Sequence, residues 1–174
     1  MKILVGSLRQ LDTLIERHAP SHVITLLAPD SDVPQCPTIA PDKRLIMLFH
    51  DLAAPMPPLL PPDGASIQRL LAFGATWDES APVLMHCWAG VSRSPAAAFI
   101  LACARSAPGQ EHAVAHRLRS ASPFATPNAL MVALADEALG REGRMIEAIR
   151  QIGRGADCGE GIAFALDRDG DGWR

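Results

Sequence analysis

The sequence has 174 residues, of which 48% are hydrophobic and 20% are charged. This composition is typical of a soluble globular domain and argues against intrinsic disorder and against a disulfide-rich scaffold. The 16 basic residues are outnumbered by 19 acidic ones. Because the net charge is -3 and no polybasic run occurs, the sequence favours neither nucleic acid nor an anionic membrane as a partner.

The apolar segments are too short for export or for membrane insertion. Only residues 3–5 form an apolar run before Gly6, which is shorter than the hydrophobic region of a signal peptide. The uncharged stretch 95–104 is far shorter than the roughly 20 residues of a membrane-spanning helix. The four cysteines, which show no Cys-x-x-Cys spacing, are Cys36, Cys87, Cys103 and Cys158. We therefore expect a cytoplasmic protein without a zinc site or a disulfide framework.

Four short apolar runs in the first half predict strands over residues 3–5, 22–27, 45–49 and 83–85. Polar residues do not alternate with apolar ones in these runs, which is typical of strands buried on both faces of a parallel sheet. Apolar residues at helical spacing predict helices over 8–18 and 66–77. The order predicts an α/β domain with a central, mainly parallel sheet of four to five strands flanked by helices.

The second half is predicted to be helical, with helices over residues 94–105, 110–119, 127–139 and 142–152. Thr126 is placed to cap the third of these helices, and glycines follow the last two. Glycines accumulate from residue 154 onward. We therefore predict a single domain over residues 1–153 and a flexible tail over 154–174.

The tail contains Asp167-Arg168-Asp169-Gly170-Asp171-Gly172, which is similar to the beginning of a calcium-binding loop. The bidentate carboxylate at the twelfth position of such a loop is missing. We therefore predict no metal site in this segment or elsewhere.

The most informative segment is His86-Cys87-Trp88-Ala89-Gly90-Val91-Ser92-Arg93-Ser94. A buried strand leads into Cys87, and Arg93 begins a helix after a short loop with a central glycine. A loop in this position turns its amides inward and binds an anion, aided by the helix dipole. Gly90 permits the conformation that closes the loop, and the planar guanidinium of Arg93 matches two phosphoryl oxygens. The pattern predicts a phosphate-binding loop that consists of Trp88, Ala89, Gly90, Val91, Ser92 and Arg93.

Cys87 is predicted to be the nucleophile at the base of this loop. A free thiol is only slightly ionised at neutral pH, whereas the loop amides, the helix N-terminus and Arg93 all favour negative charge on the sulfur. Ser94 is placed to donate a hydrogen bond to the sulfur and to help it leave when a thiophosphate is hydrolysed. The alternative, a buried strand cysteine without chemistry, is disfavoured by the spacing of Gly90 and Arg93. Trp88 either forms a wall of the site or packs on the sheet.

His86-Cys87, Gly90, Arg93 and Ser94 resemble the signature of the protein tyrosine phosphatase superfamily. Residues 89–94 resemble its dual-specificity branch, and the chain is also similar to small bacterial tyrosine-phosphatase-like proteins. The resemblance implies hydrolysis of phosphomonoesters through a phosphocysteine intermediate, without a cofactor. The implied substrates are small phosphomonoesters or phosphorylated proteins, with phosphotyrosine first and phosphoserine or phosphothreonine beside it. It also implies supporting roles for His86 and for Asn128, whose Pro127-Asn128 pair resembles one that follows the signature loop in this branch.

The implied mechanism needs an aspartate as general acid, upstream of the cysteine. Asp51 follows the predicted strand 45–49, so it emerges at the same carboxyl edge of a parallel sheet as Cys87. Asp63 is the alternative, although its place before a helical run is typical of an N-cap. We therefore predict Asp51 as the acid.

Two other classes of function remain open. One is a catalytically silent phosphate-binding module, which the intact set of Cys87, Arg93 and Ser94 disfavours. The other is a rhodanese-like or arsenate-reducing thiol enzyme, in which a loop can also place cysteine and arginine at this spacing. Gly90 and the Ser94 hydroxyl favour the phosphatase.

Overall fold

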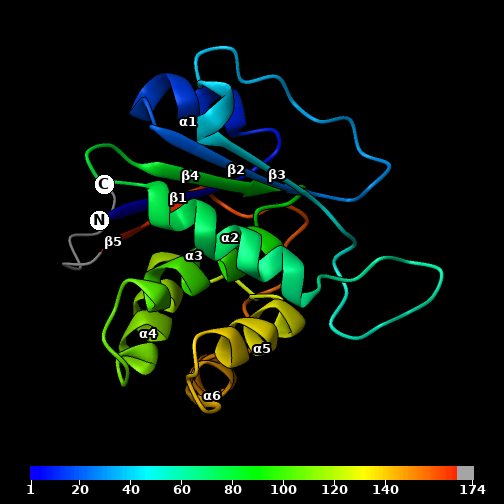
Figure 1. Cartoon of the computed structure of the whole chain (residues 1–174), viewed down its shortest axis with the longest axis vertical. Coiled ribbons are helices and arrows are strands. Elements are labelled where there is room, and N and C mark those ends of the chain that lie inside the picture. Colours follow the sequence, from blue (N-terminus) through cyan, green and yellow to red (C-terminus); the bar gives the residue numbers. More distant parts are fainter. Residues whose placement is uncertain (168–174) are drawn as a thin grey trace.

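A five-stranded sheet forms the centre of the molecule in the computed structural model, which describes residues 1–167 (Figure 1). Its strands are β1 (Lys2–Ser7), β2 (His22–Leu27), β3 (Arg44–Leu48), β4 (Val83–Cys87) and β5 (Phe164–Asp167). Their order in the sheet is β3-β2-β4-β1-β5, and the first four in this order are parallel. The predicted α/β fold with a mainly parallel sheet of four to five strands is confirmed, and β5, which runs antiparallel to β1, makes the sheet mixed.

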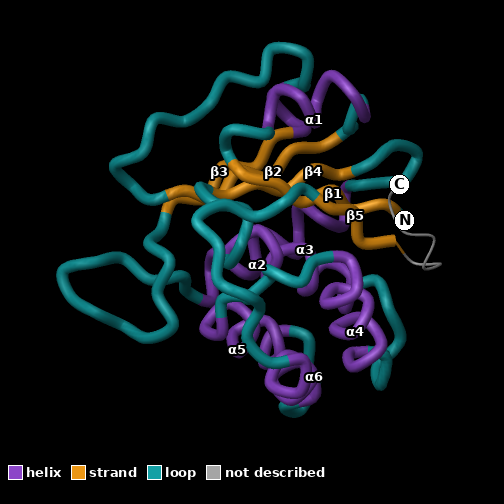
Figure 2. The backbone as a smooth tube through the Cα atoms, turned by 180° about the vertical axis from the view of Figure 1, so that it is seen from behind, coloured by secondary structure: helices purple, strands orange, loops and turns teal. Residues whose placement is uncertain are grey.

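Helices cover both faces of the sheet, as a parallel sheet requires. Helix α1 (Leu11–His18) lies on one face (Figures 1 and 2). The helices on the opposite face are α2 (Gly64–Thr76), α3 (Arg93–Ala104), α4 (Glu111–Ala121), α5 (Ala129–Ala138) and α6 (Arg144–Ile152). Among these, α3 is buried along nearly its whole length, so its first residues lie inside the molecule. No helix within residues 1–167 is both long enough and apolar enough to cross a membrane.

The start of α5 differs from the prediction. Asn128, and not Thr126, is the N-cap residue, because the Asn128 Oδ1 atom accepts a hydrogen bond from the Met131 amide at 2.9 Å. Thr126 instead accepts the Gly155 amide at 3.0 Å through Oγ1. The helix therefore starts two residues after Pro127, and the Asn128 amide nitrogen remains available to contact other segments.

The carboxyl ends of the parallel strands meet at one edge of the sheet. Cys87, the last residue of β4, pairs in register with Ser7 of β1 and with Leu26 of β2. Because β4 lies between these two strands, Cys87 occupies the middle of the edge. The loop 88–92 then connects a buried strand to a buried helix, and this connection fixes the loop at both ends.

The segment after α6 is not the flexible tail that the sequence predicts. Residues 164–167 form β5, in which Phe164 pairs with Val5 and Leu166 pairs with Ile3. Residues 164–166 are buried, and Ala156 and Gly161 donate backbone hydrogen bonds to Pro123 and Ala89, respectively. The prediction is wrong for residues 154–167, because a short apolar run there completes the sheet edge. The rest of the calcium-loop-like run, from residue 168 onward, lies outside the described residues.

We expect Leu166→Ala to lower the free energy of unfolding by about 2–5 kcal/mol, the usual range for truncating a core leucine. Leu166 is 1% exposed and packs in the core, whereas its neighbour Ile162 is 68% exposed. Ile162→Ala is therefore the matched control, with an expected change within about 0.5 kcal/mol. Urea unfolding followed by circular dichroism measures both, and equally small changes would show that β5 contributes nothing to the folded core.

Candidate active site

Cys87 is buried at the carboxyl end of β4, with a hydroxyl beside its sulfur. The Ser94 Oγ atom donates to Cys87 Sγ at 3.1 Å and lies 3.4 Å from the carbonyl oxygen of Gly6. Both Cys87 and Ser94 are held by regular structure, since one ends a strand and the other lies in the first turn of α3. A hydroxyl donor in this position stabilises negative charge on the sulfur.

The loop that follows Cys87 is anchored through its carbonyl groups. Four of these carbonyls accept backbone hydrogen bonds of 2.8–3.2 Å. The Leu8 amide donates to Trp88 and the Gly161 amide donates to Ala89. The Thr126 amide donates to Val91 and the Ala96 amide donates to Ser92. The carbonyl and the following N–H of a trans peptide point in opposite directions. The amides of residues 89, 90, 92 and 93 therefore point away from these partners, toward the space that the loop encloses. Such a ring of amides at the start of a helix is an anion-binding site.

Gly90 is required at its position for two reasons. Its φ of +72° lies in the left-handed region, which side chains disfavour. A Cβ atom there would also stand 2.9 Å from the carbonyl carbon of Gly6 and from the amide nitrogen of Ser7. The end of β1 therefore packs directly against the loop backbone, and any larger residue would push the two apart.

Arg93 is a buried cation that still has a donor to offer. The residue is 6% exposed, and its Nη1 atom donates to the carbonyl oxygen of Phe49 at 2.8 Å. Its Nε atom lies 3.9 Å from Asp51 Oδ2 and has no hydrogen-bond partner among residues 1–167. A buried N–H without an acceptor is unfavourable unless a ligand supplies one, and an oxyanion would do so.

Asp51 lies beside the loop, at the edge where the strand order places it. Its Oδ1 atom accepts hydrogen bonds from Ser92 Oγ at 2.7 Å and from Asn128 Nδ2 at 2.8 Å. Asn128 Nδ2 also donates to the carbonyl oxygen of Leu52 at 3.0 Å, so one side chain joins α5 to the segment that carries Asp51. The carboxylate is thereby fixed through Oδ1, while Oδ2 stays on the side of Arg93.

Asp63, the alternative acid, occupies the N-cap of α2. Its Oδ1 atom accepts the Ser66 amide at 2.8 Å, and hydrogen bonds from Ser66 lower the pKa of this carboxyl. A carboxylate stabilised in its charged form as a helix cap is poorly suited to donating a proton. Asp63 thus caps a helix, whereas Asp51 lies beside the loop that follows Cys87.

His86 supports the site from inside the sheet. Its Nε2 atom forms a 2.8 Å hydrogen bond with Thr25 Oγ1 on β2, and burial lowers the pKa of His86 to about 4. The imidazole is therefore neutral at pH 7. It holds β4 against β2 directly before Cys87 without adding charge.

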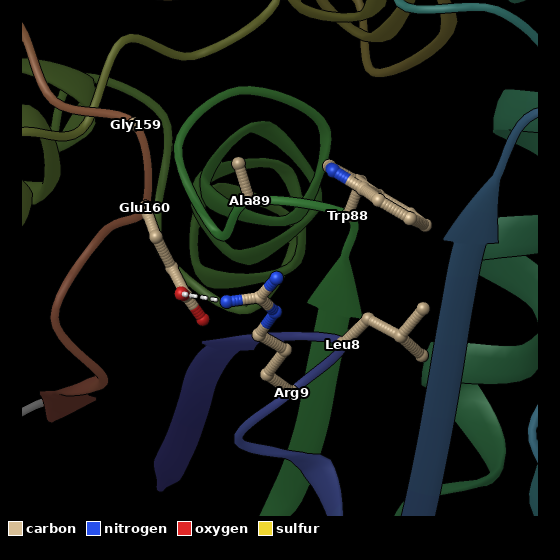
Figure 3. A pocket seen from close by; sticks show the side chains of 6 residues that line it. All are labelled: Leu8, Arg9, Trp88, Ala89, Gly159 and Glu160. Atoms are coloured by element: carbon tan, nitrogen blue, oxygen red, sulfur yellow. Dashed lines mark ion pairs between the residues drawn. The ribbon is translucent and has the colours of Figure 1, made fainter.

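Trp88 projects from the loop and is 64% exposed, so it does not pack on the sheet. It lines a pocket of about 350 Å³ beside the loop 88–92 (Figure 3). We call this the flanking pocket; it is lined by Leu8, Arg9, Trp88, Ala89, Gly159 and Glu160. Four of these six residues were not identified from the sequence. Leu8 and Arg9 could have been found, because they follow the first predicted strand, which ends at the same edge of the sheet as Cys87. No sequence pattern marks Gly159 or Glu160.

No group of three or more histidine, cysteine or acidic side chains gathers as metal ligands within the described part of the chain. The side chains that surround Cys87 instead supply hydrogen-bond donors and one carboxylate.

Comparison with solved structures identifies proteins that have the same fold. DUSP15 is 18% identical with a TM-score of 0.58, over 86% of this chain and 89% of that one. Human DUSP28 is 19% identical with a TM-score of 0.54, over 86% of this chain and 94% of that one. Tk-PTP in its active form is 18% identical with a TM-score of 0.50, over 76% of this chain and 86% of that one. The chain therefore shares its fold with these three proteins. The sequence itself matches no protein-family model and no curated protein.

Proposed function

We propose that the chain is a cysteine-dependent phosphatase that hydrolyses phosphomonoesters, with phosphotyrosine in proteins, beside phosphoserine and phosphothreonine, as its substrate class. The observation that carries the proposal is the Nε atom of buried Arg93, which has no hydrogen-bond partner among residues 1–167 and lies next to a loop whose carbonyls are bonded outward. A phosphoryl group has the charge and the oxygen geometry to satisfy both Arg93 and the amides of this loop. The fold shared with DUSP15 and human DUSP28 supports the same assignment.

The first step forms a phosphocysteine. The Cys87 thiolate attacks phosphorus while the loop amides and Arg93 hold the phosphoryl oxygens and stabilise the charge of the transition state. The sulfur–phosphorus bond forms, the bond from phosphorus to the ester oxygen breaks, and Asp51 gives its proton to that oxygen. The alcohol or phenol then leaves.

The second step returns the enzyme to its starting state. Asp51, now ionised, removes a proton from water, and the water oxygen attacks phosphorus. The sulfur–phosphorus bond breaks and inorganic phosphate is released. Cys87 leaves as a thiolate, and the Ser94 hydroxyl at 3.1 Å stabilises the charge that it acquires.

The position of Asp51 suits both roles. Its Oδ1 atom is held by Ser92 and Asn128, which leaves Oδ2 to carry the transferred proton. A bound phosphoryl dianion would supply Arg93 with a new partner and would place negative charge beside Asp51.

The proposal extends to a reducing compartment, the cytoplasm, because the mechanism needs a free thiol. All four cysteines are free, and three of them, Cys36, Cys87 and Cys103, are buried.

No observation favours sulfur transfer or arsenate reduction over phosphate hydrolysis. A silent phosphate-binding module is disfavoured by the contact between Ser94 and Cys87, which phosphate binding alone does not require.

Cys87→Ser tests the proposal directly. We expect the wild type to hydrolyse p-nitrophenyl phosphate and the variant to show no turnover, because a serine hydroxyl lacks an acidic proton and is a poor leaving group here. The loop and Arg93 survive the change, so calorimetry should show that tungstate still binds. Turnover in the variant within about tenfold of the wild type, which is only ~1.4 kcal/mol of barrier, would contradict the role of Cys87 as nucleophile. Tungstate binding without turnover in the wild type would instead indicate a silent module.

Asp51→Asn and Asp63→Asn form a matched pair that tests the general acid. Asp51→Asn should slow hydrolysis of alkyl phosphates by about 10²–10⁴-fold, the usual contribution of general acid catalysis. It should slow nitrophenyl phosphate hydrolysis less, because that leaving group needs no proton. Asp63→Asn should leave both rates near those of the wild type, since asparagine caps a helix as well as aspartate does. A steep dependence on the leaving group in the Asp63 variant alone would exchange the two roles.

A further inference from the structure

We propose that the flanking pocket is a subsite for a basic side chain, lysine or arginine, next to the phosphorylated residue of a substrate. The inference rests on the proposed function, because it places the phosphoryl group in the loop above Cys87. The pocket begins where that loop begins, at Trp88 and Ala89, and extends to a carboxylate on the opposite wall, Glu160 (Figure 3).

Three segments that are distant in sequence build the pocket and are fixed to one another. The Leu8 amide donates to the Trp88 carbonyl at 3.2 Å, which joins the β1–α1 connection to the loop. The Gly161 amide donates to the Ala89 carbonyl at 2.8 Å, and Gln10 Nε2 donates to the Gly161 carbonyl at 3.0 Å. The segment before β5 is thus tied to both other walls. The pocket exists before any ligand binds, so its occupation costs little ordering.

Glu160 is the fixed charged group of the pocket. Its Oε1 atom accepts a hydrogen bond from the hydroxyl of Ser7, a buried residue whose backbone pairs with Cys87 in the sheet. The other carboxylate oxygen, Oε2, lies 3.9 Å from Arg9 Nη1. A carboxylate held in this way by a buried donor presents its second oxygen in a defined direction, as recognition of a cation requires.

Arg9 is held far more weakly than Glu160. Its side chain is 85% exposed, against 36% for Glu160, and an exposed ion pair at the limit of contact contributes little free energy. The Arg9 guanidinium can therefore yield its place to a cation from the substrate. For the same reason we favour a basic ligand at Glu160 over an acidic ligand at Arg9.

The remaining walls suit the stem of a long basic side chain. Leu8 and Trp88 are apolar, and the Trp88 ring stands at the rim of the pocket (Figure 3). Methylene groups of lysine or arginine pack on apolar surfaces of this kind, and a cation near an indole face gains further attraction. A carboxylate near an anion-binding loop also weakens phosphate binding unless a cation accompanies the phosphate. A substrate that carries both charges satisfies both sites.

The test compares phosphotyrosine peptides that differ at one neighbouring position. Lysine, norleucine or glutamate is placed directly before or directly after the phosphotyrosine, and kcat/KM is measured for each peptide. At one of the two positions, we expect the wild type to favour lysine over norleucine by about tenfold, the size of one good charged contact. Norleucine keeps the apolar stem, so the ratio isolates the effect of the charge.

Three variants locate the preference. In Glu160→Gln the ratio of lysine to norleucine should fall to within about twofold, because the amide cannot pair with a cation. In Arg9→Ala the ratio should rise, because the competing guanidinium is gone. In Glu137→Gln, a matched loss of charge at the exposed end of α5, the ratio should stay that of the wild type. The ratio is taken within each variant, so a general loss of activity does not change it.

Turnover of p-nitrophenyl phosphate separates the two claims. If the wild type hydrolyses it but uses the lysine and norleucine peptides equally at both positions, the subsite is wrong and the proposed function stands. Preference for the glutamate peptide, lost in Arg9→Ala, would show that the pocket binds anions and would overturn the inference. If neither p-nitrophenyl phosphate nor any peptide is hydrolysed, the proposed function fails, and the inference fails with it.

Discussion

The site depends on how the backbone between β4 and α3 is held. Four carbonyls of this loop are hydrogen-bonded to the β1–α1 connection, the segment after α4, the first turn of α3 and the segment before β5. Each of these bonds turns an amide toward the enclosed space, so the binding of an anion is a consequence of contacts made outside the loop. Packing of Gly90 against the end of β1 adds a steric constraint to the same arrangement. Segments from several parts of the fold thus fix the orientation of the few peptide groups in this loop.

The charges of the site follow from this backbone. Arg93 enters the interior because it begins a buried helix, and its Nε atom has no hydrogen-bond partner among residues 1–167. An unsatisfied buried donor costs about 1–3 kcal/mol, so the folded state is poised to gain free energy from an oxyanion. Ser94 then lies at the Cys87 sulfur, and Asp51 lies near Arg93. A buried, neutral His86 completes the floor and adds no competing charge.

The sequence predicts the parts of the site that are local along the chain. The segment from His86 to Ser94 contains the strand end, the loop and the helix start in one continuous run, so its pattern alone indicates a phosphate loop. Asp51 could be predicted by one further step, because parallel strands end at the same edge of a sheet. The apolar runs also predict the four parallel strands, but not the order β3-β2-β4-β1 in which they lie.

The rest depends on contacts between distant segments. Strand β5 is a short apolar run within a glycine-rich region, and only its pairing with β1 makes it a strand. Glu160 acquires its place from that pairing and from the hydroxyl of Ser7, which composition does not reveal. Asn128, and not Thr126, is the cap, and its amide group also bonds Asp51, a second partner that a propensity argument does not include.

A trapped covalent intermediate tests the central claim most directly. The enzyme would be mixed with excess nitrophenyl phosphate, quenched in acid within the first turnovers and analysed by peptide mass spectrometry. We predict one added phosphoryl group on the peptide that contains Cys87, located on the sulfur. Steady turnover with no phosphoryl group on Cys87, or with the group on another residue, would contradict the account.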